Sequence, residues 1–280
     1  MYLELGESIS LRDLLYGLML VSGNDAAIAI AVHIGGSVEG FAALMNKEAY
    51  GLGALNTHFV TPNGLHDNEH YSTAYDMCVI TAHAMQNETF REIVSAKYYR
   101  STTGNVIRSM KNKNKILWQY EGGNGVKTGF TTQAGKCLVF SAQRDGMTIV
   151  GAVLNCPNMF NDAITMLDYG FDNYSVKKII SAGEPIVRIR VENSLKTNLA
   201  LAVKRDIIIP VSNGGDATVR TRVFTEDNIT APINKGDVLG SLEIWEGDRI
   251  LIKEDLVACE EVGGVTFSYF LNKLFGWWTA

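Results

Sequence analysis

The sequence has few cysteines, no basic block and no long apolar run, and each absence narrows the classes of protein to which it can belong. No stretch reaches the roughly 18 apolar residues of a membrane-spanning helix. The formal net charge is −5, so nucleic acid is not an expected partner. The four cysteines have no CxxC spacing and no histidine cluster, which favours buried apolar cysteines over a disulfide and argues against a zinc site; they are Cys78, Cys137, Cys156 and Cys259.

The first 21 residues do not have the composition of a signal peptide, because they carry Glu4, Glu7, Arg12 and Asp13. We expect no cofactor and no metal. The amino-acid composition is that of an ordinary globular chain, with 46% hydrophobic and 20% charged residues. A length of 280 residues favours two domains.

Residues 1–174 mix helical and strand patterns without a βαβ rhythm, which favours an α+β domain. Ser10, Ser37 and either Ser72 or Thr73 are candidate helix N-caps. The pattern further predicts a small-residue helix over 25–34, an extended segment over 97–108, strands over 126–140 and 147–154, and a helix over 161–172.

Residues 175–262 have a different pattern, in which short segments of alternating apolar and polar residues are separated by turns with Gly and Asp. Val187, Ile189 and Val191 alternate with charged residues, as in a half-exposed strand. We therefore predict a small all-β domain, with further strands over 199–204, 206–211, 217–224, 237–245 and 249–253.

Residues 263–280 predict an amphipathic helix. Its apolar stripe is formed by Phe267, Phe270, Leu271, Leu274, Phe275 and Trp278. A helix with one apolar stripe and terminal tryptophans favours contact with a membrane interface through 267–278. The alternative is a helix that packs on its own β domain.

Two short motifs carry the chemistry. Ser22-Gly23-Asn24 follows an apolar helix pattern, and Lys127-Thr128-Gly129 opens a strand pattern. A strand edge with lysine and threonine can bind an extended peptide and its terminal carboxylate. Gly129 leaves the backbone open to a substrate. Taken singly, Asn24 is equally a helix cap and Lys127-Thr128 a solvated strand entry.

The longer surroundings of both motifs resemble the D-alanyl-D-alanine carboxypeptidase family, the low-molecular-weight penicillin-binding proteins. The resemblance is close over residues 1–174 and extends to the β domain and the tail. It is carried by SGNDAA at 22–27, HIGGS at 33–37, FxxLMN at 41–46, NTHFVTPNGL at 56–65, YSTAYDM at 71–77 and VKTGFT at 126–131, with AG at 134–135 and CL at 137–138.

The resemblance implies a serine-type enzyme that removes the terminal D-alanine from peptidoglycan stem pentapeptides through an acyl-enzyme. It implies a proton-relay role for Ser22, substrate orientation by Asn24, and carboxylate binding by Lys127 and Thr128. The backbone N–H of Phe130 would be one oxyanion-hole donor. Where many members of the family have an arginine that adds a carboxylate contact, this chain has Asn158-Met159-Phe160.

The family also uses a Ser-x-x-Lys nucleophile motif, which should precede Ser22. The one Ser-x-x-Lys in these 280 residues is Ser175–Lys178, which comes after Lys127 and at the predicted domain junction. We therefore expect a sequence truncated at its N-terminus and inactive as it stands. We also expect apolar surface left uncovered around residues 26–31 and 137–152.

Two alternatives remain open at this point. A catalytically dead peptidoglycan-binding or scaffold protein would use the same cleft without reaction, and a β-lactamase would need a fast deacylation apparatus. The resemblance to the family implies that the partners are peptidoglycan stem peptides and, for the complete protein, β-lactam antibiotics. The expected location is the outer face of the bacterial cytoplasmic membrane.

Overall fold

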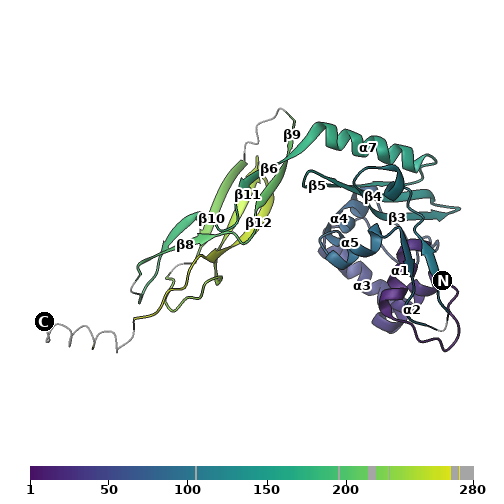
Figure 1. The fold of residues 1–280 in the computed structure, drawn as a ribbon, viewed down its shortest axis with the longest axis horizontal. Coiled ribbons are helices and arrows are strands. Elements are labelled where there is room, and N and C mark those ends of the chain that lie inside the picture. The colour runs from purple at the N-terminus through teal and green to yellow at the C-terminus, as the bar shows by residue number, and fades with distance from the viewer. Residues whose placement is uncertain (105, 195, 214–218, 227, 266–270, 272–280) are drawn as a thin grey trace. The chain divides into compact units, whose positions relative to one another are not determined.

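The computed structural model describes all residues except 105, 195, 214–218, 227, 266–270 and 272–280. The chain divides into two compact units, Met1–Asn173 and Tyr174–Ala280 (Figure 1). Each unit has its own hydrophobic core and is considered by itself.

Seven helices lie in the described part of the first unit. Local capping starts several of them as the sequence predicts: the hydroxyls of Ser10, Ser37 and Thr73 accept hydrogen bonds from backbone N–H groups three residues on. The helices are α1 (Leu11–Val21), α2 (Asn24–Gly35), α3 (Val38–Gly51), α4 (Ala74–Ala84), α5 (Glu88–Ser95), α6 (Ile116–Gln119) and α7 (Met159–Asn173).

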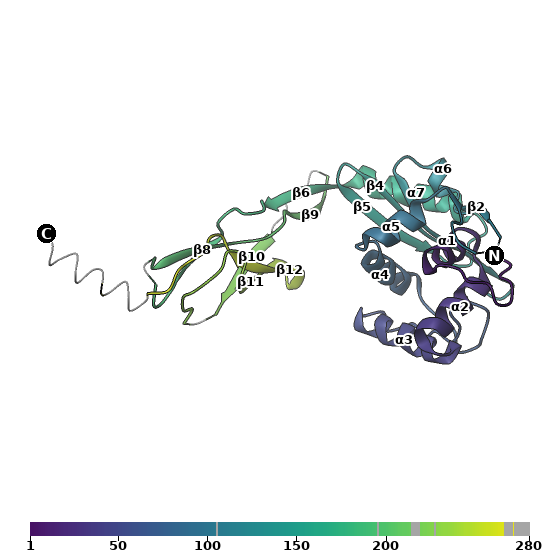
Figure 2. The ribbon, with the colours of Figure 1, turned by 60° about the horizontal axis from the view of Figure 1, so that its bottom comes forward.

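The central sheet of this unit is antiparallel and has the order β3-β4-β5, with bounds Gly123–Thr131, Gly135–Arg144 and Met147–Val153. Leu138, Phe140 and Ala142 of β4 pack against α7, whereas Val139 belongs to the cluster that includes residues of α4 and α5 (Figures 1 and 2). Because side chains alternate along a strand, β4 is covered on both faces. A two-stranded sheet of β1 (Tyr98–Arg100) and β2 (Ser109–Lys111) completes the unit.

Two expectations for this unit are wrong in detail. Residues 126–140 form a hairpin of β3 and β4 rather than one strand, because the chain turns before Gly135, whose φ is +67°. Among the described residues of 97–108, a strand is formed only over β1. Uncovered apolar surface is found only in part where it was expected: Ile28 is 41% exposed, whereas Ala26, Ile30 and Ala31 are at most 5% exposed, and Leu138, Phe140 and Ala142 at most 1%. The packing of α1 and α3 on α2, and of α7 on β4, explains this burial.

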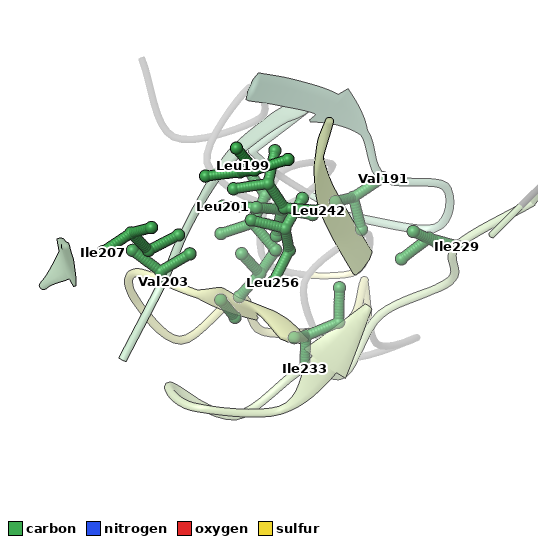
Figure 3. Packing of buried hydrophobic residues seen from close by; sticks show 12 residues of the cluster. Val191, Leu199, Leu201, Val203, Ile207, Ile229, Ile233, Leu242 and Leu256 are labelled. Carbon is green, nitrogen blue, oxygen red and sulfur yellow. The ribbon is translucent and has the colours of Figure 1, made fainter. Parts of the chain in front are cut away.

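The second unit is all β in its described residues up to 265, and Leu271 is helical. One sheet has the order β10-β11-β12-β8-β7, and β6 pairs with β9. The strands are β6 (Tyr174–Ile180), β7 (Val187–Arg190), β8 (Asn198–Ala202), β9 (Ile207–Ser212), β10 (Val219–Thr225), β11 (Val238–Glu246) and β12 (Arg249–Ala258). Leu199, Leu201, Leu242 and Leu256 are fully buried together at its centre (Figure 3).

The predicted amphipathic stripe at 267–278 lies outside the described residues, apart from Leu271. Among the described residues no single helix is long and apolar enough to cross a bilayer. The pair α2 and α3 meets the criteria of length and composition together, but the chain bends by 82° between them. All four cysteines are unpaired and half-buried.

Candidate active site

The junction between α1 and α2 presents Ser22 and Asn24 on one short turn. Ser22 is the C-cap of α1 and has left-handed backbone angles, φ 59° and ψ 49°, with its N–H bonded to the Gly17 carbonyl. Such a conformation costs a non-glycine residue about 1 kcal/mol, and strained residues of this kind concentrate at functional sites. The N-cap of α2 is Gly23, so Asn24 is the first helical residue and not the cap.

Lys127 of β3 reaches this turn from a position 105 residues further along the chain. Its ammonium donates to the Ser22 hydroxyl oxygen at 2.5 Å and to the Thr128 carbonyl at 2.7 Å. Burial, with a smaller contribution from the nearby positive charge of Lys113, lowers the pKa of Lys127 to about 8. The ammonium is therefore desolvated and held by two oxygen acceptors, and it forms no salt bridge with a carboxylate of the described residues.

Lys113 also contacts the end of α1, next to the turn that carries Ser22. The sequence analysis did not identify this residue. Its ammonium donates to the Val21 carbonyl at 2.9 Å, and its backbone N–H donates to the Leu20 carbonyl at 3.1 Å. A cation at a helix C-terminus is favourable. The alternating Lys-Asn run at 111–115 was the available signal, but its partners on α1 are about 90 residues away and only the fold identifies them.

A further part of the wall comes from the loop 56–71, which contributes residues 63–65. The Asn46 side chain exchanges two hydrogen bonds with the backbone of Phe59, at 2.8 and 2.7 Å. His70 Nδ1 accepts from the backbone N–H groups of Val60 at 3.0 Å and Thr61 at 3.3 Å. Together these side chains fix the loop whose tip, residues 63–65, faces the site.

A hollow of about 650 Å³ gathers these elements. All six residues that the sequence proposed as site residues line it: Ser22, Asn24, Lys127, Thr128, Gly129 and Phe130. Asn63, Gly64, Leu65, Lys113, Thr131, Lys136, Met159 and Phe160 complete the lining. The lining contains three lysines and no carboxylate, so the hollow suits an anionic ligand.

β3 is also an edge strand, with β4 on one side and no described strand on the other. An extended peptide can therefore pair with its free edge. Gly129 adds room, since a Cβ built there would have one neighbouring atom, at 3.7 Å.

Ser175 and Lys178 lie elsewhere, on β6 of the second unit. Lys178 forms an ion pair with Asp206 at 2.5 Å, and neither residue lines the hollow. A strand places residues i and i+3 on opposite faces, so this pair is not arranged as nucleophile and base. Within the described ranges no group of three His, Cys, Asp or Glu side chains could hold a metal ion.

The chain is similar to known proteins over both of its units. Residues 1–158 match the family model for D-alanyl-D-alanine carboxypeptidase, and residues 174–263 match that for the C-terminal domain of penicillin-binding protein 5. The chain is 33% identical over 284 residues to D-alanyl-D-alanine carboxypeptidase DacF of Bacillus subtilis, covering 99% of this chain and 73% of that protein. It is 34% identical to DacA of Haemophilus influenzae, covering 99% and 70%.

Among solved structures, penicillin-binding protein 5 of Haemophilus influenzae matches with a TM-score of 0.69 and 33% identity, covering 94% of this chain and 77% of that one. The predicted α+β domain followed by an all-β domain is thereby confirmed. By sequence and by fold, the chain belongs to the D-alanyl-D-alanine carboxypeptidase family of enzymes.

Proposed function

We propose that the hollow bounded by Ser22, Asn24 and Lys127 is the substrate cleft of a serine-type D-Ala-D-Ala carboxypeptidase acting on peptidoglycan stem peptides. The observation that carries the proposal is the 2.5 Å contact of the Lys127 ammonium with Ser22, at the free edge of β3 and inside a hollow without carboxylates. A peptide that pairs with β3 would bring its terminal carboxylate to Lys127 and Thr128.

The chemistry would be acyl transfer. A serine hydroxyl attacks the carbonyl carbon of the penultimate residue, terminal D-alanine leaves as the amine, and water then hydrolyses the ester. In this proposal Ser22 would pass a proton to the leaving amine, and Asn24 would orient the peptide. The Phe130 N–H would stabilise the oxyanion, a contribution typically worth about 10² to 10³ in rate.

The nucleophile of this scheme is a Ser-x-x-Lys serine, and none precedes Ser22 in the 280 residues. Loss of a serine nucleophile costs on the order of 10⁶ in kcat. We therefore infer that the 280-residue chain does not form an acyl-enzyme by itself and that β-lactams are ligands of a protein that contains the motif.

Penicillin labelling tests this proposal. A fluorescent penicillin should not attach covalently to the 280-residue chain. It should attach to a version extended through the in-frame coding sequence upstream of Met1, and a serine-to-alanine change in the added motif should abolish labelling. An extended version that carries Ser-x-x-Lys but resists labelling would contradict the assignment.

A second candidate is a peptidoglycan-binding or scaffold protein without catalysis, which would use the same hollow without a reaction. The DNA immediately upstream of Met1 distinguishes the two. An in-frame stop codon with no Ser-x-x-Lys before Ser22 supports the scaffold. Hydrolysis of a β-lactam by the extended protein would instead support a β-lactamase.

We also propose attachment to the outer face of the cytoplasmic membrane through residues 267–278. Support comes from the sequence, in which apolar residues recur at helical spacing and end in Trp277 and Trp278. Deletion of residues 264–280 should release the protein from sedimented anionic lipid vesicles. Unchanged partitioning would contradict the proposal.

A further inference from the structure

The β1–β2 hairpin has one fixed face and one free face. On the fixed face, the Tyr99 ring stacks on Tyr16 of α1 with ring centres 3.6 Å apart, and Met110 lies beside them in the same buried cluster. Side chains alternate along a strand, so the residues on either side of Tyr99 and Met110 point the other way. The free face consists of four exposed residues from the two strands: Tyr98, Arg100, Ser109 and Lys111.

Trp118 of α6 extends the free face with a second aromatic ring. The rings of Tyr98 and Trp118 meet edge to face, with centres 6.3 Å apart. Tyr98 is 64% exposed and Trp118 is 39% exposed, so both rings keep surface that a ligand can contact. A hollow of about 490 Å³ lies along the hairpin, and the residues of β1 and β2 line it.

The charge of the free face is positive. The Lys111 ammonium lies 5.7 Å from the centre of the Tyr98 ring and 5.4 Å from the centre of the Trp118 ring, and this cation–π contact holds it beside both rings. Arg100 is the second cation. Neither Lys111 nor Arg100 forms a salt bridge with a described residue, and no carboxylate lines the hollow. Both charges are therefore available to an anionic ligand.

Aromatic rings next to unpaired cations match a chain of sugar rings that carries carboxylates. The C–H groups on one face of a sugar ring are weakly positive, and they pack on the negative face of an aromatic ring. Carboxylates along the same chain can form charge-assisted hydrogen bonds with lysine and arginine. A neutral sugar chain would leave the cations without a counter-charge, and an acidic chain without sugar rings would leave the aromatic rings unused.

We propose that an acidic polysaccharide binds to the hairpin surface, which we define as Tyr98, Arg100, Lys111 and Trp118. None of these residues lines the hollow of the candidate active site. The hairpin surface is therefore a second binding site on the first unit. It goes beyond the proposed carboxypeptidase function and does not depend on it.

Isothermal titration of the 280-residue chain with four short chains tests the proposal. The probes are a mannuronate hexamer, which is a carboxylated sugar chain; chitohexaose, which is a neutral one; hexaglutamate; and a thymidylate hexamer. We expect the mannuronate hexamer to bind about 5- to 10-fold more tightly than chitohexaose or hexaglutamate, because each of these two lacks one kind of contact. Added salt should weaken its binding.

Two exposed positions separate the ring contact from the charge contact. Tyr98→Ser and Lys111→Gln should each weaken binding of the mannuronate hexamer by about 3- to 10-fold. Tyr50→Ser and Lys47→Gln are the matched controls, because they make the same changes at exposed positions on α3 that line neither hollow. Both controls should keep the affinity of the unmodified chain.

Several outcomes would overturn the proposal. If chitohexaose or hexaglutamate binds as tightly as the mannuronate hexamer, one kind of contact suffices and the ligand class is wrong. Tighter binding of the thymidylate hexamer would assign the hairpin surface to nucleic acid instead. Failure of the mannuronate hexamer to bind, or equal losses in the control variants, would show that the hairpin surface is not a polysaccharide site.

Discussion

Lys127 is a cation kept in a partly buried place where its charge is costly. Burial and the charge of Lys113 lower its pKa to about 8, so the ammonium is largely protonated at neutral pH and loses its proton within the alkaline range. A binding site for a carboxylate needs the protonated form. Burial of the Lys127 charge therefore costs stability, and under the proposed function that charge holds the carboxylate of the ligand.

Peptide affinity should therefore fall as pH rises through about 8, by about tenfold per pH unit well above the pKa if binding requires the charged form. Titration of acetyl-Gln-D-Ala-D-Ala at pH 7 and pH 9 measures this effect. Lys127→Ala should bind weakly at both values. An affinity that stays constant up to pH 10 would show that the Lys127 charge does not hold the ligand.

Asp13 is a buried carboxylate with a structural role in the first turn of α1. It accepts from Tyr99 Oη at 2.8 Å and from the Thr103 N–H at 2.9 Å, and also from the Thr103 hydroxyl. Burial alone would raise the pKa of Asp13, but these hydrogen bonds outweigh it and the pKa is lowered.

Asp13→Asn should lower the free energy of unfolding by about 1–3 kcal/mol, because the amide puts a donor where Tyr99 and Thr103 both donate. Urea denaturation at pH 7 measures the change. Asp145→Asn is the control: Asp145 is exposed in the β4–β5 turn, and its effect should stay within about 0.5 kcal/mol. Similar small losses in both variants would refute the role of the Asp13 network.

At the scale of elements, the loop 56–71 depends on a neutral histidine. His70 Nδ1 accepts two backbone N–H bonds, which a protonated ring could not do. Burial is the main cause that lowers the pKa of His70; repulsion from His58 and His66 adds to it, and the Asp67 carboxylate opposes it.

Because the folded pKa lies below the ordinary value, the unfolded chain binds more protons as pH falls. The contribution of His70 to stability is complete above about pH 6.5 and is lost as pH falls from there through the lowered pKa. Chemical denaturation at pH 7.5 and 5.5 should show this loss. His70→Ala should reduce the difference between the two pH values, whereas the exposed His83→Ala should retain it.

The sequence predicted an element well where residues close to it in the chain cause it to form. The starts of α1 and α3 follow from Ser10 and Ser37, whose hydroxyls accept from N–H groups three residues away. The β3–β4 turn was missed, although the polar and small residues at 132–135 are typical of one. β6 was missed because Tyr174–Ile180 does not alternate and is a strand through its pairing with β9.

On the scale of the whole molecule, the second unit should be an independent folding unit. Its core consists of its own residues, among them Leu201, Leu242 and Ile244, each with no measurable exposure. A protein of residues 174–265 should therefore unfold cooperatively. Circular dichroism during heating is a suitable measurement, and a gradual, featureless transition would contradict the prediction.

Within that protein, Leu242→Ala should cost about 2–5 kcal/mol, the usual range for a buried leucine. Ile250→Ala is the matched control, because Ile250 is 44% exposed on β12. Equal losses would mean that the buried cluster does not determine the stability of the unit.

The sequence by itself determined the family, the division into an α+β part and an all-β part, and the six residues that line the cleft. It could do so because motif residues and caps act over a few positions. Tertiary structure decided the rest. The contact of Ser22 with Lys127 spans 105 residues, and the Lys113 contact with α1 and the His70 support of the loop also join segments that lie apart in the sequence. The hydrogen bonds and charge interactions of this site depend on distances in space and not on spacing in the chain.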